Sequence, residues 1–216
     1  VQQGCLGDMG ADKAVGCQHI TSCGRLISSQ WICHLESLPH IIIAGPAAKA
    51  EDRTSRLAAL VSQYYPELGP MRYARHDQAA PQLFLGATQI GLSIAHTDAM
   101  EVIALSTHRQ IGIDLERLDR SFPVDKLVGR YWSPGEQASL ALLTGEERRA
   151  SALAQWVRRE AMVKAKGTGL AGNLHEYEPL EDLADGKASY QSMVMGPYLM
   201  GVAWRGRQAM MVVHSK

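Results

Sequence analysis

The chain has 216 residues, enough for one large domain or two small ones with a sizeable apolar core. It carries 22 basic and 22 acidic residues, and a formal net charge of zero gives no general preference for nucleic acid or for a membrane surface. No apolar run reaches the roughly 18 residues of a membrane-spanning helix, and no signal-peptide pattern opens the chain, so we expect a cytoplasmic protein.

The beginning of the chain has little hydrophobic pattern. Residues 1–25 show no clear period, and we expect a weakly structured N-terminal segment there. The cysteines at positions 5, 17, 23 and 33 form no Cys-x-x-Cys pair, and the histidines near them complete no zinc pattern. Free thiols in a reducing compartment are therefore favoured over a zinc site.

From residue 26 the sequence takes on the pattern of an α/β unit. His40–Ala44 predicts a short buried strand, and Asp52–Tyr65 predicts an amphipathic helix. Five basic residues lie on or near this helix: Lys49, Arg53, Arg56, Arg72 and Arg75. A solvated surface is one interpretation of this set, and a phosphate-contacting patch is the other.

Three strands are predicted in the middle of the chain. Ile90–His96 alternates in polarity or size and ends on a histidine. Glu101–Ser106 follows after a turn, and Ile111–Glu116 follows after a second turn.

The third of these strands carries two carboxylates on one face. Because side chains alternate along a strand, its three apolar residues share one face, and Gly112, Asp114 and Glu116 share the other. Gly112 has no side chain and is expected to leave open space beside the carboxylates. Neighbouring like charges repel each other unless a cation lies between them, although on an exposed face this cost is minor.

Two helix starts follow the strands. Residues 133–136 (S-P-G-E) have the pattern of an N-cap, a proline at the first helical position and a capping box, and a position near a metal is the alternative for Glu136. Residues 144–147 (T-G-E-E) repeat the capping pattern and open a long helix that Gly167 is expected to end. Residues 173–216 predict loops and short strands.

The long helix places two charged residues at the edge of its apolar stripe. Glu160 and Lys164 are four residues apart, so an ion pair is one interpretation and a half-buried functional site is the other. Arg159 points to the opposite side of the helical wheel and is predicted to lie at the surface. Together with Asp114 and Glu116, Glu160 completes three carboxylates. Such a set suits Mg²⁺ or Mn²⁺, and the absence of Cys and His from it argues against zinc.

Four motifs occur in order along the chain. They are S-I-A-H (93–96), I-G-I-D-L-E (111–116), Y-W-S-P-G-E (131–136) and W-V-R-R-E-A-M-V-K-A-K-G-T-G (156–169). This ordered set resembles the 4′-phosphopantetheinyl transferase superfamily. The chain length is similar to that of the larger, surfactin-synthetase-activating type. The resemblance implies an α+β fold with two similar α/β subdomains related by a pseudo-twofold axis, here residues 26–108 and 109–216.

The resemblance also implies an activity and a metal. The expected reaction is transfer of the 4′-phosphopantetheine group of coenzyme A to a serine of an apo acyl or peptidyl carrier protein, with release of adenosine 3′,5′-bisphosphate. Asp114, Glu116 and Glu160 fall on the family's magnesium ligands, and Mn²⁺ is a possible substitute. The expected catalytic residues are Asp114, Glu160 and Lys164, with Glu160, directly or through a water on the metal, as the candidate base for the serine.

Contacts to coenzyme A follow from the same resemblance. Lys164 falls on the family's phosphate-contacting lysine, and His96 falls on the histidine that touches the coenzyme A phosphates. Arg53 and Arg56 are candidates for holding the 3′-phosphate. We expect a monomer whose partners are coenzyme A and a carrier protein, without a nucleic acid or membrane partner. The candidate residues for docking the carrier are Leu127, Val128 and Tyr131.

The alternative function is that of a non-catalytic relative that binds coenzyme A or a carrier protein. Residues 95–97 read A-H-T where the family usually has S-H-S, and no lysine precedes Pro81 where the family usually has G-K-P. These two departures favour the alternative. The intact acidic positions and Lys164 favour the enzyme.

Overall fold

The computed structural model describes residues 40–47, 49–75, 81–107, 110–167, 186–205 and 211–215. The segment 1–25 and the four cysteines lie outside these residues, so the predictions made for them are not addressed by the structure. No helix among the described residues is long and apolar enough to cross a membrane.

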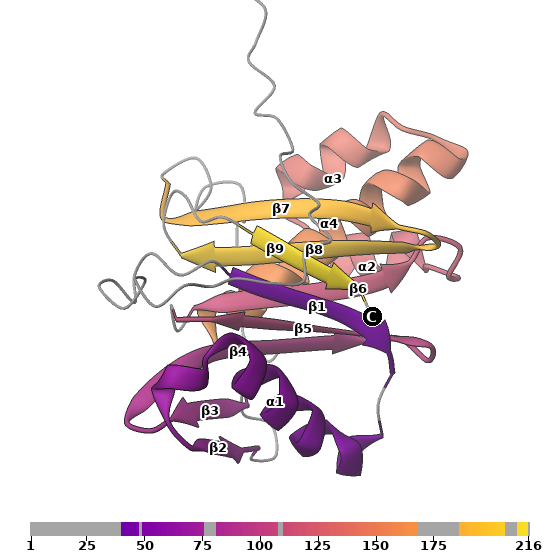
Figure 1. Ribbon diagram of the computed structural model, residues 1–216. Helices are drawn as coiled ribbons and strands as arrows, with labels where there is room; N and C mark the ends of the chain where they lie inside the picture. The colour runs from indigo at the N-terminus through magenta and orange to yellow at the C-terminus, as the bar shows by residue number, and fades with distance from the viewer. Residues whose placement is uncertain are drawn as a thin grey trace, which may run out of the picture.

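The first half of the chain contributes most of a six-stranded sheet (Figure 1). Its elements are β1 (His40–Pro46), α1 (Ala50–Tyr64), the short 3₁₀ helix η2 (Pro66–Leu68), β2 (Met71–Ala74), β3 (Gln82–Leu85), β4 (Thr88–His96) and β5 (Met100–Ser106). The strand order is β2-β3-β4-β5-β1-β9, where β9 (Met211–Ser215) comes from the end of the chain and runs parallel to β1. The other neighbours in this sheet are antiparallel.

The second half of the chain builds a smaller sheet and three helices. Its elements are β6 (Ile111–Arg117), α2 (Val124–Tyr131), α3 (Pro134–Ala141), α4 (Gly145–Lys166), β7 (Ala188–Met195) and β8 (Tyr198–Arg205). The three strands form an antiparallel sheet in the order β6-β8-β7. The mixed composition of strands and helices confirms the predicted α+β class.

The two halves repeat one arrangement of strand, helix and hairpin. In the first half β1 is followed by α1 and the β4–β5 hairpin, and β5 pairs antiparallel with β1. In the second half β6 is followed by α4 and the β7–β8 hairpin, and β8 pairs antiparallel with β6. The prediction of two similar subdomains is confirmed by this shared connectivity. A boundary at residues 108 and 109 stays a prediction.

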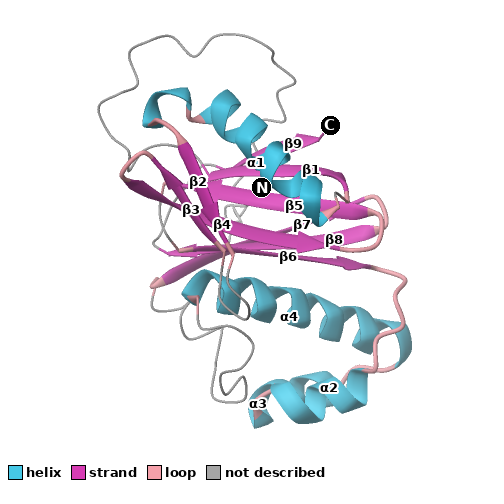
Figure 2. Ribbon diagram, turned by 90° about the horizontal axis from the view of Figure 1, so that it is seen from below, coloured by secondary structure: helices cyan, strands magenta, loops and turns pink. Residues whose placement is uncertain are grey.

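Alternating side chains connect the two sheets to their helices and to each other. Ile43 of β1 packs in one apolar core with Leu57 of α1. Its neighbour Ile42 faces the other way, into a second core that contains Ile113 of β6. The two helices consequently lie on opposite outer sides of the strands, and α4 runs along β6 (Figure 2). This packing follows from the period-2 pattern of the strands.

Most of the predicted elements are present. The strands expected at 40–44, 90–96, 101–106 and 111–116 and the helix expected at 52–65 match observed elements whose ends differ by two residues or fewer. Ser133 forms the predicted capping box with Glu136 at the start of α3. Helix α4 ends at Gly167, which adopts a left-handed conformation with φ of 72°.

Helix α2 was not predicted, and its position corrects the docking prediction. Val128 is 5% exposed and belongs to an apolar cluster between α2, α3 and α4. Leu127 and Tyr131 pack against the same cluster. These three side chains hold the helices together, so the prediction that they form a docking surface is wrong for the buried Val128 and is not supported for the other two.

A close approach of two backbones joins α4 to β6. An added Cβ at Gly112 would lie 1.9 Å from the carbonyl oxygen of Ala161 and 2.4 Å from the amide nitrogen of Ala165. The prediction of open space beside Gly112 is therefore wrong, because the backbone of α4 fills that space. A glycine is required here for steric reasons, since any side chain would push the helix away from the strand.

A buried ion pair joins α1 to β5 in the first half of the chain. Glu101 of β5 has a fully buried side chain and accepts hydrogen bonds from Arg53 Nε at 3.1 Å and Arg53 Nη2 at 2.9 Å. Arg56 donates to the same carboxylate at 3.2 Å and to the carbonyl of Pro46 at 2.8 Å. Arg53 is only 7% exposed, so its interpretation as part of an open phosphate-contacting patch is wrong. A contact of Arg56 with coenzyme A stays a prediction.

The ion pair yields a stability prediction. Arg53→Met leaves the buried Glu101 carboxylate short of its two-pronged partner, and we expect it to lower the free energy of unfolding by about 3 kcal/mol. The double variant Arg53→Met/Glu101→Leu removes both charges and should recover most of this loss. Urea unfolding measures both effects. An unfolding midpoint of Arg53→Met equal to that of the unmodified chain would contradict the structural role.

The contact between α4 and β6 yields a second prediction. Gly112→Ala forces a methyl group into the backbone of α4, and we expect it to destabilise the protein by more than about 3 kcal/mol or to prevent folding. Gly129→Ala in α2 is the matched control, because an added Cβ there meets nothing within 4 Å. This control should raise stability by about 0.5–1 kcal/mol. Thermal unfolding of the two variants makes the comparison, and a stable Gly112→Ala protein would refute the packing argument.

Candidate functional site

A cavity of about 490 Å³ opens between the end of β4, the middle of β6 and the C-terminal half of α4. The predicted site residues that line it are His96, Asp114, Glu116, Glu160 and Lys164. The structure therefore brings together side chains that lie up to 68 positions apart in the sequence (164 minus 96). Arg53 and Arg56 do not belong to its lining, because their guanidinium groups bind Glu101.

Lys164 lies between two carboxylates. Its Nζ is 2.7 Å from Asp114 Oδ1 and 3.5 Å from Glu160 Oε2. It also donates to the carbonyl oxygen of Ile113 at 3.1 Å. The predicted ion pair within the helix is present, but the shorter contact goes to Asp114 on the neighbouring strand. Both interpretations of Glu160 and Lys164 therefore apply, because the pair lies inside a charged cavity.

One oxygen in this cavity has no hydrogen-bond partner in the part of the chain that the structure describes. It is Oδ2 of Asp114, a residue that is 4% exposed. A buried carboxylate oxygen without a donor is costly, so such an atom calls for a ligand, a cation or a water. Asp114 lines the cavity together with Glu160 and Lys164, so the missing partner of Oδ2 would have to bind there.

Burial and crowding of like charge raise the pKa of two carboxyl groups. Removal from water raises the pKa of Glu160 to about 8, and the charge of Asp114 adds to this effect while Lys164 opposes it. Burial also raises the pKa of Glu116, with Asp114 acting in the same direction and Arg120 in the opposite one. Burial alone would lower the pKa of Lys164, but Asp114 and Glu160 outweigh it and the net shift is upward.

Glu116 has a basic partner that the sequence analysis did not single out. Arg120 pairs with the Glu116 carboxylate through Nη1 and lines the same cavity. The spacing of four residues was an available signal, although these two residues lie at a strand end and the following turn and not on a helix. In the structure each of the three carboxylates thus has a basic side chain beside it, either Lys164 or Arg120.

The three carboxylates fit a hard divalent cation in their chemistry. Oxygen donors of this kind suit Mg²⁺ or Mn²⁺, and the unpartnered Oδ2 of Asp114 supplies a donor that no described residue uses. Among the described residues, no three side chains of His, Cys, Asp or Glu lie close enough together to hold one metal ion. Arg120 pairs with Oε1 of Glu116 and so places a positive charge beside this carboxylate.

Two other residues of the motifs have structural roles. Glu136 accepts a hydrogen bond from the amide of Ser133 at 3.1 Å and pairs with Arg159 through Nη2. Arg159 is 1% exposed and its guanidinium lies 5.5 Å from the centre of the Trp132 ring. The prediction that Arg159 lies at the surface is wrong, because it joins α3 to α4 from within. The capping role of Glu136 is confirmed, and Glu136 does not line the cavity.

The altered histidine motif has a local explanation. The amide of Met100 donates to Thr97 Oγ1 at 3.1 Å, so Thr97 closes the turn between β4 and β5. Ala95 is buried in the core between the sheets. His96, between them, is exposed at the rim of the cavity. The change from S-H-S to A-H-T therefore leaves the histidine accessible.

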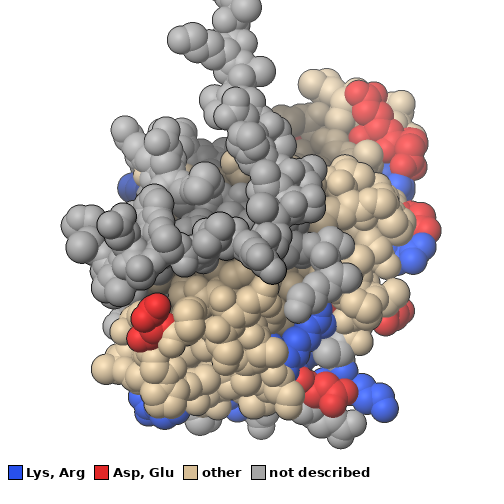
Figure 3. All heavy atoms as spheres, in the orientation of Figure 1, with Lys and Arg blue, Asp and Glu red and all other residues tan. Residues whose placement is uncertain are grey.

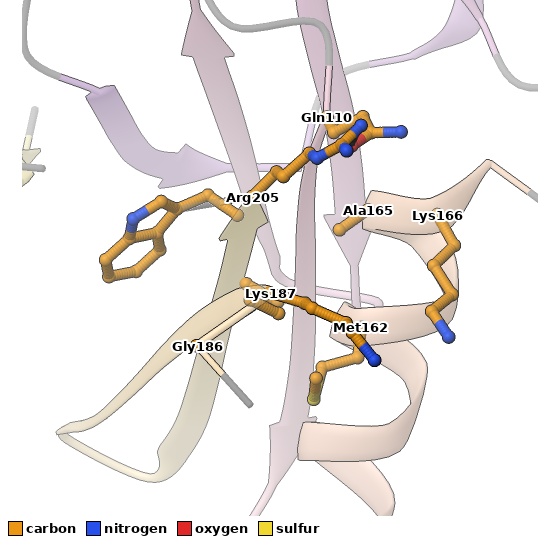
Figure 4. Close-up of a pocket in the computed structure, with 10 residues that line it drawn as sticks. Gln110, Met162, Ala165, Lys166, Gly186, Lys187 and Arg205 are labelled. Atoms are coloured by element: carbon orange, nitrogen blue, oxygen red, sulfur yellow. Dashed lines mark hydrogen bonds between the residues drawn. The ribbon is translucent and has the colours of Figure 1, made fainter. Parts of the chain in front are cut away.

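A second cavity, of about 370 Å³, lies beyond the last turns of α4. Figure 4 shows the side chain of Arg205 directed toward Gln110 at one end and Lys187 and Met162 toward the other end. Its described lining residues include no carboxylate or histidine, so it lacks the donors of the first cavity. The first cavity is therefore the candidate active site.

The raised pKa of Glu160 yields a prediction for the metal-free protein. Folded Glu160 holds its proton up to about pH 8, whereas the unfolded side chain loses it near its ordinary pKa of 4.5. Stability should therefore fall between about pH 5 and pH 8, by up to about 1.4 kcal/mol per pH unit. Glu160→Gln removes this dependence, so its melting temperature relative to the unmodified chain should rise with pH. Melting curves recorded with a chelator test this, and parallel curves would contradict it.

Comparisons with known proteins agree with the motifs. Residues 110–196 match the family described as the 4′-phosphopantetheinyl transferase superfamily. The chain is 36% identical over 92 residues to the Synechocystis sp. protein named "Putative 4'-phosphopantetheinyl transferase slr0495", a match that covers 43% of this chain and 37% of that protein. It is 31% identical over 114 residues to the Nostoc sp. 4′-phosphopantetheinyl transferase HetI, covering 52% of this chain and 48% of that protein.

These matches place the similarity on the second half of the molecule. The matched region spans less than half the length of each of these curated relatives. It contains β6, α4 and all three carboxylates of the cavity. The segment 110–196 of this chain is thus similar to the 4′-phosphopantetheinyl transferase superfamily, the family that the motifs resemble.

Proposed function

We propose that the protein transfers the 4′-phosphopantetheine group of coenzyme A to a serine of an apo acyl or peptidyl carrier protein. The observation that carries this proposal is the meeting of Asp114, Glu116, Glu160 and Lys164 in one cavity within the segment that matches the transferase family. Carboxylates that can hold a divalent cation, together with a lysine, are suited to a diphosphate, because the cation and the ammonium would neutralise the negative charge that grows on its oxygens during the reaction.

The proposed reaction exchanges one phosphorus–oxygen bond for another. The serine oxygen forms a bond to the phosphorus that carries the pantetheine arm. The bond between that phosphorus and the oxygen of the adenosine bisphosphate breaks, and adenosine 3′,5′-bisphosphate leaves. The serine loses its proton to a base in the cavity.

The side chains of the cavity divide this work. Lys164 offers its ammonium to the diphosphate and has Asp114 and Glu160 as partners before substrate arrives. Glu160, directly or through a water on the metal, is the proposed base, because its carboxylate lies in the cavity beside Lys164 and Asp114. His96 stands exposed at the rim, where it can contact the phosphates of coenzyme A.

A magnesium ion held by Asp114, Glu116 and Glu160 would supply charge neutralisation at the diphosphate. The orphaned oxygen of Asp114 supports this assignment. Mn²⁺ offers the same chemistry to the same oxygen donors. The proposed transfer therefore requires Mg²⁺ or Mn²⁺.

Figure 3 shows blue and red side chains interspersed along the rim of the visible face, without a large area of one sign. This arrangement does not favour a polyanion such as nucleic acid. A monomeric state and a cytoplasmic location stay predictions.

The central test is a transfer assay. Incubation of the protein with coenzyme A, Mg²⁺ and apo carrier proteins should add the phosphopantetheine arm to the carrier, as intact mass spectrometry measures. A carrier whose serine is replaced by alanine should stay unmodified. Bound coenzyme A without modification of any carrier would instead support the non-catalytic alternative.

Two variants with matched controls test the residue assignments. Asp114→Ala should abolish transfer, whereas Asp119→Ala removes an exposed aspartate near the same strand and should leave it intact. Glu160→Gln should slow transfer by about 10²- to 10⁴-fold, the usual contribution of a positioned base. Glu147→Gln, at an exposed position of the same helix, is its control. Full activity of either site variant, with an unchanged melting temperature, would show that the assignment is wrong.

A further inference from the structure

Arg120 occupies a position in the cavity that none of the motifs explains. Its guanidinium pairs with Glu116, and it lines the cavity together with Asp114 and Glu160. Its side chain is 38% exposed and that of Glu116 is 14% exposed, so the pair stands at the boundary between the site and solvent. Arg120 thus pairs with Glu116, one of the proposed metal ligands, and its side chain is exposed enough to move away from that carboxylate.

The backbone that carries Arg120 is held in place. Arg149 of α4 donates to the carbonyl oxygen of Leu118 at 2.7 Å and to that of Arg120 at 3.5 Å. The amide of Leu118 donates to the carbonyl of Pro197 at 2.8 Å. These bonds attach the turn after β6 to the long helix and to the β7–β8 turn. The backbone of Arg120 is therefore fixed, and its movement is limited to the side chain.

In the conformation that pairs with Glu116, the guanidinium also lies beside an aromatic ring. It lies 5.6 Å from the centre of the Phe122 ring, and Phe122 is buried against Trp156. A cation over an aromatic face gains a modest attraction, so Arg120 keeps a favourable contact when its carboxylate partner changes. The structure thus offers the side chain two partners besides solvent.

A divalent cation and Arg120 compete for the same carboxylate. While Arg120 pairs with Glu116, Lys164 pairs with the other two carboxylates, those of Asp114 and Glu160. The ion pair uses Oε1 of Glu116, so a metal bound to the same carboxylate would lie close to the guanidinium, and the two positive charges would repel each other. The negatively charged diphosphate of the substrate would provide that guanidinium with a new partner, since arginine binds phosphate oxygens in a two-pronged geometry.

Resting on the proposed function, we propose that Arg120 is a positioning residue that couples metal binding to substrate binding. Without substrate it neutralises Glu116 and weakens metal binding. With coenzyme A it moves to the diphosphate, contacts it and frees Glu116 for the metal. By thermodynamic linkage, metal and coenzyme A then each raise the affinity for the other by the same factor.

Mn²⁺ binding to the full chain tests this proposal, measured by calorimetry or by electron paramagnetic resonance with and without coenzyme A. Without coenzyme A, Arg120→Met should bind Mn²⁺ about fivefold more tightly than the unmodified chain, because a partly exposed ion pair no longer competes. With Mn²⁺ present, the same variant should bind coenzyme A about tenfold more weakly, because a charge-assisted phosphate contact is lost. The unmodified chain should show mutual enhancement, and Arg120→Met should lose most of it.

Two further variants separate this role from a general loss of charge. Arg117→Met removes a cation from the same turn, but Arg117 pairs with Asp119 and not with Glu116, so the mutual enhancement should persist. Arg120→Lys keeps a cation near Glu116 and should retain part of the coupling. Melting temperatures identify any variant whose fold is damaged.

The outcomes distinguish the inference from the proposed function. Mn²⁺ binding by the unmodified chain with no difference in coupling between it and Arg120→Met would overturn the role of Arg120 and leave the metal site standing. The same loss of coupling in Arg117→Met and Arg120→Met would also overturn it. No Mn²⁺ binding under either condition would overturn both the metal assignment and this inference.

Discussion

The close backbone contact between Gly112 of β6 and the C-terminal half of α4 determines the geometry of the candidate active site. At this point the helix lies against the strand without an intervening side chain. Asp114 follows two residues later on the same strand face, and Lys164 lies on the helix within 2.7 Å of it. A longer distance between helix and strand would separate the carboxylate of one from the ammonium of the other. A single residue without a side chain therefore allows the Asp114 carboxylate and the Lys164 ammonium to meet.

The charged side chains of the cavity form ion pairs with one another. The basic side chains of Lys164 and Arg120 lie beside the three carboxylates, and burial together with the charge of Asp114 raises the pKa of Glu160. In the proposed function, substrate phosphates would attract the two basic groups, and a divalent cation would attract the acidic ones. An arrangement of this kind stays folded without ligands and rearranges by side-chain movement alone. The fixed turn at Arg120 and the rigid helix under Lys164 are consistent with such a movement.

Sequence patterns predicted the local elements and failed where a distant partner decides the outcome. The alternation in β6 correctly placed Asp114 and Glu116 on one face, since that depends only on the strand itself. The helical wheel gave Arg159 the wrong environment, because its buried partner Glu136 belongs to another helix. Arg53 was misassigned for the same reason, as nothing near it in the sequence indicates Glu101. Ion pairs between residues far apart in the sequence need the fold before they can be recognised.

The repeated arrangement of strand, helix and hairpin has a consequence for how the molecule divides its tasks. Each half pairs a basic residue of its helix with a carboxylate of a strand: Arg53 with Glu101 in the first, Lys164 with Asp114 in the second. The two carboxylates lie on strands that do not correspond in the repeat, since β5 matches β8 and β6 matches β1. The Arg53 side chain is 9% exposed, whereas the Lys164 side chain is 28% exposed. The pair in the first half is thus closed to solvent and the pair in the second half opens to a cavity, so one repeated arrangement of elements contains both a structural ion pair and an accessible one.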